Sequence, residues 1–170
     1  MKETESTFLD LINQHKAIIH KVSKMYMDGA EEQRDLFQEI VLQLWKAYPG
    51  FKGNSKFSTW MYRVSLNTAL VYFKKDQRKI DKTPLDARID LVDNNESDQK
   101  EEKLAYLYKA VQELNAVEKA LIFLFLENQS HKEIAENLGI SEVNARVRLN
   151  RTKEKLQIII KKNGYEFWRN

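Results

Sequence analysis

The sequence predicts an all-α protein made of two small helical domains, a three-helix bundle and a four-helix domain, joined by a flexible acidic linker. Two observations support this fold class. The 170 residues include only 5 Gly and 2 Pro, far fewer than the turns of a strand-rich chain require. Apolar residues also recur at spacings of three and four over most of the chain, the period of an amphipathic helix.

Three helices are expected in the first part of the chain. The first has an apolar stripe through residues 8–26, with Thr7 as a candidate capping residue paired with Asp10. The second covers about residues 31–48 and stops at Pro49-Gly50. The third starts near Phe57. It is expected to turn Trp60, Val64 and Val71 inward and to leave a second set off this face, namely Tyr62, Arg63, Asn67 and Lys74.

Residues 80–100 lose the apolar period and are rich in Asp, Asn, Ser and Glu, a composition typical of a mobile linker. Helical spacing then resumes, with helices expected at about residues 104–114, 117–127, 132–138 and 141–161. We therefore expect a first domain at residues 1–79, a linker at residues 80–100 and a second domain at residues 101–170.

Several classes of function are disfavoured by composition. The chain has no Cys, which excludes disulfides, thiolate catalysis and Fe–S clusters. Its few glycines are too scattered for a phosphate-binding loop. His15 and His20 do not have the spacing of paired metal ligands on a helix, and His131 is isolated. We expect no cofactor, no metal and no enzymatic activity. With neither a secretion signal nor a membrane span in evidence, a cytoplasmic protein is expected.

The charges of the chain are grouped along the sequence. The net charge is only +3, but two basic blocks, residues 52–82 and 144–162, flank an acidic block. A protein that makes two separate contacts to a polyanion requires two such basic blocks.

A helix-turn-helix is the motif with the clearest mechanism. In residues 129–156, Gly139 stands at a turn and Ala145 packs the second helix. A structural helical hairpin with a basic face is the alternative. The side chains available to DNA are Asn144, Arg146, Val147, Arg148, Asn150 and Arg151.

A second signal lies in residues 51–75, where aromatic and basic residues alternate on a loop and the following helix. Aromatic rings stack on unpaired bases, so this segment suits separated strands better than a duplex. For Phe57, Trp60 and Val64 we favour a role in the core. Tyr62, Asn67 and the loop are better candidates for contacts to DNA.

These segments together resemble the extracytoplasmic-function (ECF) sigma factors, the small promoter-specificity subunits of bacterial RNA polymerase. The run DLFQEIVLQLW at residues 35–45 is similar to the family's region 2.2. Residues 51–75 are similar to its regions 2.3 and 2.4, with the run STWMYRVSLN at residues 58–67 as the most specific part. Residues 129–156 are similar to region 4.2. The resemblance implies a sigma factor that directs core RNA polymerase to promoters and assists strand opening without ATP. Core polymerase and promoter DNA are the implied partners, and an anti-sigma factor is a candidate further partner.

The resemblance also implies three sets of site residues. Polymerase binding is assigned to Asp35, Leu36, Gln38 and Glu39. The minus-ten element is assigned to a base pocket in the loop and to the helix after it, comprising Phe51, Lys52, Gly53, Asn54, Ser55, Lys56, Tyr62, Arg63, Asn67, Lys74 and Lys75. The minus-thirty-five element is assigned to Ser141, Asn144, Arg146, Val147, Arg148, Asn150, Arg151 and Lys153.

Two alternatives from other classes remain. A stand-alone helix-turn-helix regulator would bind duplex DNA by itself and would leave the aromatic loop around Phe51 unexplained. A structural adaptor would explain the helices but not both basic blocks.

Overall fold

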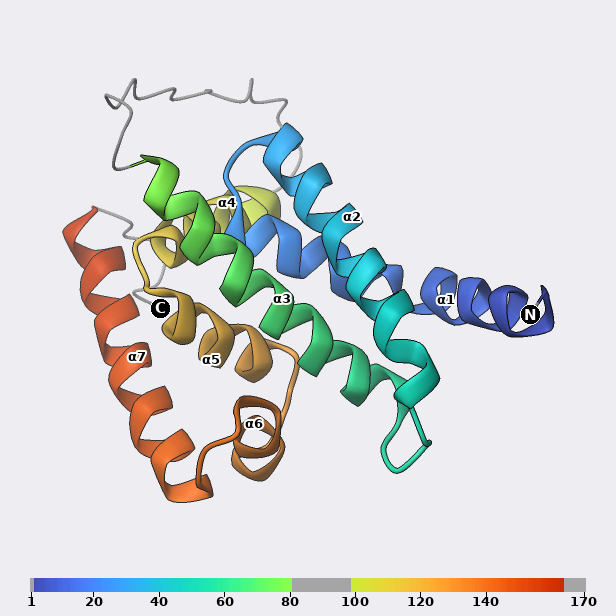
Figure 1. Ribbon diagram of the computed structural model, residues 1–170. Coiled ribbons are helices and arrows are strands. Elements are labelled where there is room, and N and C mark those ends of the chain that lie inside the picture. The colour runs from blue at the N-terminus through green and yellow to red at the C-terminus, as the bar shows by residue number, and fades with distance from the viewer. Residues whose placement is uncertain (1, 81–98, 164–170) are drawn as a thin grey trace.

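The computed structural model describes residues 2–80 and 99–163, and all regular structure in this described part is helical (Figure 1). The all-α prediction is therefore confirmed. The predicted linker at residues 80–100 falls largely outside the described residues. Before it lie α1 (Lys2–Tyr26), α2 (Ala30–Ala47), a short 3-10 helix (Tyr48–Gly50) and α3 (Phe57–Ile80). After it lie α4 (Gln99–Gln112), α5 (Ala116–Leu126), α6 (His131–Leu138) and α7 (Glu142–Lys162).

Helices α1, α2 and α3 pack on one another as the predicted three-helix bundle. Two details of the prediction are wrong. Thr7 caps nothing, because α1 already begins at Lys2 and the Thr7 hydroxyl donates to the Glu3 carbonyl inside the helix, at 2.8 Å. Val71 is not in the core, since 56% of its surface is exposed. The buried side chains of the bundle include Phe8, Ile19, Val22, Leu36, Ile40, Leu44, Met61 and Leu66.

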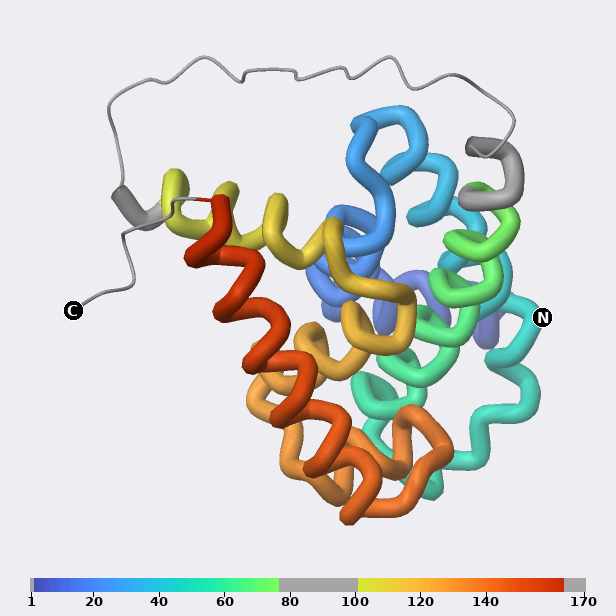
Figure 2. The backbone as a smooth tube through the Cα atoms, turned by 90° about the vertical axis from the view of Figure 1, so that its left-hand side faces the viewer, coloured from blue at the N-terminus to red at the C-terminus, as the bar shows by residue number. Residues whose placement is uncertain are grey.

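Helix α5 is the centre of the second half of the protein. It is apolar nearly all the way round, and such a helix is stable only when other elements cover most of its surface. Helices α6 and α7 cover part of it, and α1 and α3 of the first domain cover another part. Figures 1 and 2 show α3 lying between α2 and the helices of the second half. The fully or nearly fully buried residues of α5 include Ala120, Leu121, Ile122, Phe123 and Leu124.

The ends of the short helices are fixed by local hydrogen bonds. Asn115 begins α5 and Ser130 begins α6, each within a capping box closed by a Glu three residues later. Gly139 ends α6 in the left-handed conformation, with φ of 67°, which a residue with a Cβ adopts only with strain. The predicted turn at Gly139 is confirmed. No helix in the described part of the chain has the length and apolar composition needed to cross a membrane.

Candidate nucleic-acid interface

Helix α7 presents polar and basic side chains on the side away from its packed face. Ala145, Leu149 and Thr152 face the interior, whereas Arg146, Arg148, Asn150 and Arg151 are exposed and Asn144 is half-buried. At 100° per residue these side chains occupy two flanks of the helix. Asn144, Arg148 and Arg151 lie on one flank. Arg146, Asn150 and Lys153 lie on the other, with Val147 between the flanks and 41% exposed.

The first flank borders a cleft. Arg148 donates from Nε to the Asn144 Oδ1 at 3.0 Å, so an amide and a guanidinium are held side by side one turn apart. Arg148 and Arg151 then line a cleft of about 760 Å³ that also reaches Lys74 at the end of α3. Basic residues that the sequence assigned to two different promoter elements therefore face one hollow in this structure.

Besides Asn144 and Arg148, three more predicted contact residues of the second domain have partners inside the protein. The Ser141 hydroxyl accepts from the Asn144 backbone N–H at 3.1 Å and caps α7. Arg146 lies 3.7 Å from the carboxylate of Glu142. The Lys153 ammonium lies over the ring of Phe125, 3.8 Å from its centroid. These contacts orient the start and the second flank of α7.

In the first domain, the loop before α3 rests on an aromatic cluster. The ring of Phe51 packs 5.1 Å from that of Trp60 and 5.7 Å from that of Phe57, centroid to centroid. Phe57, Trp60 and Val64 all pack against the core, as predicted. Gly53 has a φ of 73°, so the loop turns back on itself. Its remaining side chains are exposed, namely Lys52, Asn54, Ser55 and Lys56.

Helix α3 continues from this loop with a stripe of exposed side chains. Arg63, Asn67 and Lys74 are exposed and lie at i, i+4 and i+11, on one side of the helix. Val71 fills the gap between Asn67 and Lys74 on the same stripe, and sequence reasoning missed it because an apolar residue was expected to point inward. The signal available in the sequence was that Val71 follows Asn67 by four residues, which places both side chains on the same side of a helix. Lys75 is also exposed but lies off this stripe.

Tyr62 differs from the other predicted minus-ten residues because it is only 9% exposed. Its hydroxyl donates to Glu127 Oε2 at 2.9 Å and its ring packs against Phe123, with centroids 5.9 Å apart. Burial and the neighbouring Glu127 carboxylate raise the pKa of Tyr62. In this conformation the second domain covers the side chain, which the sequence pattern had left outside the core.

A third surface lies on α2. Asp35 and Gln38 are exposed, and Glu39 is half-buried and accepts from Gln43 Nε2 at 2.8 Å. Leu36 does not belong with them. Its side chain is 0% exposed because it points into the bundle, so no partner can reach it without moving the helix.

The α2 surface continues as an apolar groove that the sequence analysis did not identify. Leu42 and Trp45 follow Asp35 and Gln38 along the helix and are 44% and 42% exposed. A groove of about 400 Å³ lies between them and the start of α1. Glu5, Phe8, Leu9, Phe37, Gln38, Val41, Leu42 and Trp45 line it.

Comparison with known families matches both halves of the chain. The model of sigma-70 region 2 matches residues 11–79 and the model of sigma-70 region 4 matches residues 104–156. The ECF RNA polymerase sigma factor SigW of Bacillus subtilis is 24% identical over 177 residues, covering 92% of this chain and 90% of SigW. SigG of Mycobacterium tuberculosis is 42% identical over 48 residues, and this match spans only 13% of the length of SigG.

Comparison with solved structures supports the fold. The sigma factor RpoE of Bartonella quintana, solved in complex with the anti-sigma factor NepR, superposes with a TM-score of 0.70. The superposition covers 95% of this chain and 98% of RpoE at 16% sequence identity.

Proposed function

Because this chain belongs to the extracytoplasmic-function group of the sigma-70 family, we propose that it directs core RNA polymerase to specific promoters and assists their opening. The observation that carries this proposal is the presence of both a region 2 and a region 4 in one chain, each with exposed basic side chains. The proposed domain bounds are residues 1–79 and 101–170, with residues 80–100 as the linker. The protein is proposed to act in the cytoplasm as an initiation factor and not as an enzyme.

We propose that core polymerase docks on the exposed side of α2. Asp35, Gln38 and Glu39 supply a polar and acidic edge, and Leu42 and Trp45 supply adjoining apolar area. Exposed apolar residues next to charged ones are typical of protein interfaces, where the apolar part supplies affinity and the charges guide association. Leu36 supports this face from inside the bundle.

The second domain is proposed to read the minus-thirty-five element with α7. A helix-turn-helix places its second helix in the major groove, where Asn recognises adenine and Arg recognises guanine or contacts phosphate. Asn144 and Arg148 are the proposed base-reading pair, because the hydrogen bond between them holds the amide and the guanidinium side by side. The remaining predicted residues, Ser141, Arg146, Val147, Asn150, Arg151 and Lys153, are proposed to contact the backbone or the groove walls.

The first domain is proposed to open the minus-ten element. The loop of residues 51–56 is the proposed pocket for an extruded base, and Asn67 is the proposed base contact beside it. Extruding a base costs a few kcal/mol, which stacking of roughly 1–3 kcal/mol per base and cationic contacts must offset. Arg63, Lys74 and Lys75 are the proposed cationic contacts. Tyr62 is proposed to contact the DNA as well, but only when the second domain moves away from it.

A gel shift with and without core polymerase tests the function. The probe is a pool of random-sequence duplexes, from which bound DNA is recovered and sequenced. We expect selective binding only when core polymerase is present. Selective binding by the protein alone would favour a stand-alone helix-turn-helix regulator, and no binding in either case would favour a structural adaptor.

Permanganate footprinting on a selected promoter tests the assignment of the opening surface. Asn67→Ala, and separately a Gly/Ser replacement of residues 51–56, should leave polymerase docking nearly intact but abolish reactive thymines near the start site. A pre-melted bubble should restore activity to the loop replacement at least partly. Opening by both variants at the parent rate would show that these residues are merely structural.

A further inference from the structure

Helix α7 carries two exposed valines that packing does not explain. Val143 is 69% exposed and Val147 is 41% exposed, and neither belongs to the hydrophobic core. They are four residues apart, so their Cβ atoms are about 5–6 Å from each other on one side of the helix. Valine is a poorer helix former than Ala, Lys or Glu, so local helix stability does not favour it at these positions either. We call Val143 and Val147 the valine pair. Sequence reasoning did not assign Val143 to any site.

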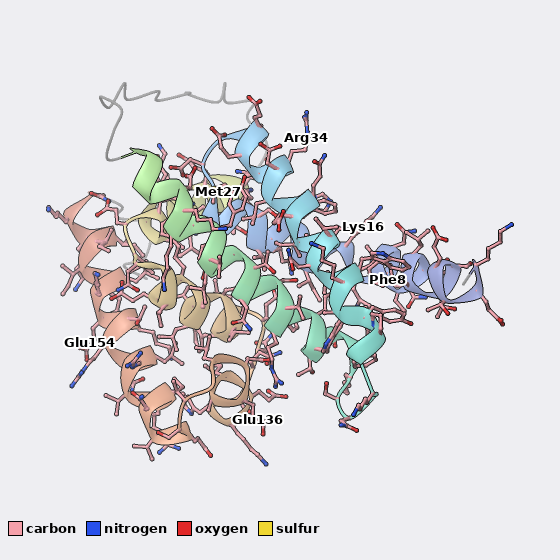
Figure 3. The ribbon with its side chains drawn as sticks, viewed as in Figure 1. Phe8, Lys16, Met27, Arg34, Glu136 and Glu154 are labelled. Carbon is pink, nitrogen blue, oxygen red and sulfur yellow. The ribbon has the colours of Figure 1, made fainter. Side chains whose placement is uncertain are left out.

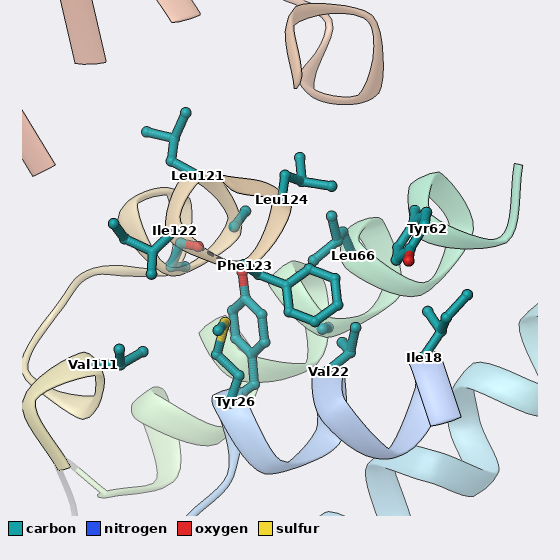
Figure 4. Close-up of a cluster of buried hydrophobic side chains, with 14 of the residues drawn as sticks. Ile18, Val22, Tyr26, Tyr62, Leu66, Val111, Leu121, Ile122, Phe123 and Leu124 are labelled. Carbon is teal, nitrogen blue, oxygen red and sulfur yellow. Dashed lines mark hydrogen bonds between the residues drawn. The ribbon is translucent and has the colours of Figure 1, made fainter. Parts of the chain in front are cut away.

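The packed face of α7 is complete without the valine pair. Ala145 and Leu149 are buried, and α7 packs against α5 and α6. Figure 4 shows Leu121 of α5 pointing away from Val22 of α1, and Leu121 is itself buried. At 100° per residue the valine pair lies roughly 180° from the packed face of α7, on the line of the helix that is farthest from the core.

The valine pair also lies between the two polar flanks of α7. Asn144 and Arg148 are on one side of it, and Arg146 and Asn150 are on the other. In a helix-turn-helix the N-terminal residues of the second helix contact base edges in the major groove. Both valines belong to the first two turns of α7. The pair is therefore in place to face base edges together with Asn144 and Arg148.

The same line of α7 is unsuited to DNA further along the helix. Glu154 is exposed and follows Val147 by seven residues, two turns along the same side. Figure 3 shows Glu154 on the outer side of α7. Its carboxylate would repel phosphates, but it lies about 16 Å from Val143 along the helix, farther than the roughly 12 Å width of the major groove. The exposed apolar surface is thus confined to the part of α7 that enters the groove.

Thymine is the base whose major-groove edge matches an apolar side chain. Guanine, adenine and cytosine are recognised there by hydrogen-bonding groups, whereas thymine adds its C5 methyl group. A valine against a hydrogen-bonding edge displaces water without replacing its hydrogen bonds, which costs affinity. A valine against a thymine methyl group buries apolar surface of both partners. The spacing of the valine pair corresponds to about two base pairs, since successive bases are about 3.4 Å apart.

We propose that Val143 and Val147 contact thymine methyl groups at one base pair, or at two neighbouring base pairs, of the minus-thirty-five element. This inference rests on the proposed function and narrows it: it gives Val147 a base contact, adds Val143 to the promoter-reading residues and predicts part of the sequence that is read. The valine pair is continuous with the α7 surface proposed for this element, so its position favours DNA as the occupant. A contact to core polymerase is the rival that the experiment decides.

Removing single methyl groups from the DNA tests the contact. A promoter is first selected with the parent holoenzyme, and each thymine of its minus-thirty-five element is replaced in turn by deoxyuridine, which pairs in the same way but lacks the methyl group. We expect binding of the parent holoenzyme to fall about fourfold at one thymine or at two neighbouring thymines, as burial of one methyl group implies. Cytosine at such a position should gain a similar factor when its C5 carbon is methylated. Binding that deoxyuridine leaves unchanged at every thymine would overturn the proposal, as would a selected element without thymine on either strand.

Serine variants assign this effect to the valine pair. Ser has a helix propensity similar to that of Val, and both positions are exposed, so Val143→Ser combined with Val147→Ser should stay folded, which circular dichroism checks. Holoenzyme with this double variant should bind the thymine and deoxyuridine promoters equally. Ile158→Ser is the matched control, because Ile158 is 65% exposed on the same helix but lies about 22 Å from Val143 along it. The control should respond to deoxyuridine as the parent does. A loss of the parent size that persists in the double variant would overturn the proposal.

Capture by immobilised core polymerase separates the different failures. The double variant should be captured as well as the parent. Reduced capture with an undiminished response to deoxyuridine would show that the valine pair docks on polymerase instead. If the parent holoenzyme selects no promoter, the proposed function itself fails. If it selects promoters whose binding does not respond to deoxyuridine, the thymine contact is refuted and the proposed function stands.

Discussion

Replacing Lys119 with Met should change how the stability of the protein depends on pH. Lys119 is 0% exposed. Its ammonium donates to Gln112 Oε1 at 2.9 Å and to the Met25 carbonyl at 3.3 Å, and it lies 4.5 Å from the centroid of the Phe73 ring. Burial of this charge among uncharged groups lowers the pKa of Lys119 from 10.5 to about 8, an effect that the Asp28 carboxylate partly opposes.

The direction of the effect follows from proton counting. Between pH 8 and pH 10 the unfolded chain holds a proton on Lys119 that the folded protein has largely released, so the free energy of unfolding rises with pH. One proton corresponds to about 1.4 kcal/mol per pH unit, which gives at most about 3 kcal/mol over this window. Lys119→Met removes this contribution. It also leaves Gln112 Oε1 without the Lys119 donor and removes one of the two donors to the Met25 carbonyl, which Gln112 Nε2 still reaches at 3.0 Å. This cost does not depend on pH.

Urea denaturation of the parent and of Lys119→Met at pH 7, 8, 9 and 10 measures this contribution. The difference in unfolding free energy, parent minus variant, should be flat below pH 8 and should then grow in favour of the parent. Tyr26 and Tyr62 also have raised pKa values, but both proteins contain them, so their titration largely cancels in the difference. A difference that stays constant from pH 7 to pH 10 would refute the reasoning.

Three further changes test other parts of the structure. Gly139→Ala should lower the free energy of unfolding by about 1–2 kcal/mol, because Ala adopts the left-handed backbone conformation only with strain. A Cβ at this position would meet no atom within 4 Å, so the backbone is the whole cost. Gly50→Ala is the control in the same denaturation assay, since Gly50 has equal space and no positive φ and its replacement should not destabilise the protein. Ser130→Ala removes the cap of α6 and should cost about 1 kcal/mol, seen in the same measurement as a lower midpoint. Asp35→Lys should reduce capture of the protein by immobilised core polymerase and make that capture depend less on salt, with no change in circular dichroism. The control is Glu136→Lys at an exposed position in the second domain, which should leave capture unchanged. Undiminished capture of Asp35→Lys would place docking elsewhere.

The local sequence pattern was sufficient to predict those features of the fold that depend only on residues a few positions apart. The helices follow from apolar residues at a period of 3.6, and the turn after α6 follows from Gly139, because both depend on backbone geometry that neighbouring residues decide. The outward position of Arg148 and Asn67 follows from the same periodicity. The capping boxes at Asn115 and Ser130 were also readable, since each has a Glu three residues later.

The contacts between the domains were decided only by tertiary structure. Lys119 lies on α5 and Tyr62 on α3, and a lysine or a tyrosine on a helix is ordinarily left at least partly in water. They are buried because α5 is apolar on more than one face, and α1 and α3 cover the face that its own domain leaves open. Nothing within a helical turn of either residue specifies a partner 65 or 94 positions away. Sequence periodicity gives the direction of a side chain relative to its own helix, whereas only the packing of whole helices determines which other helix stands in that direction.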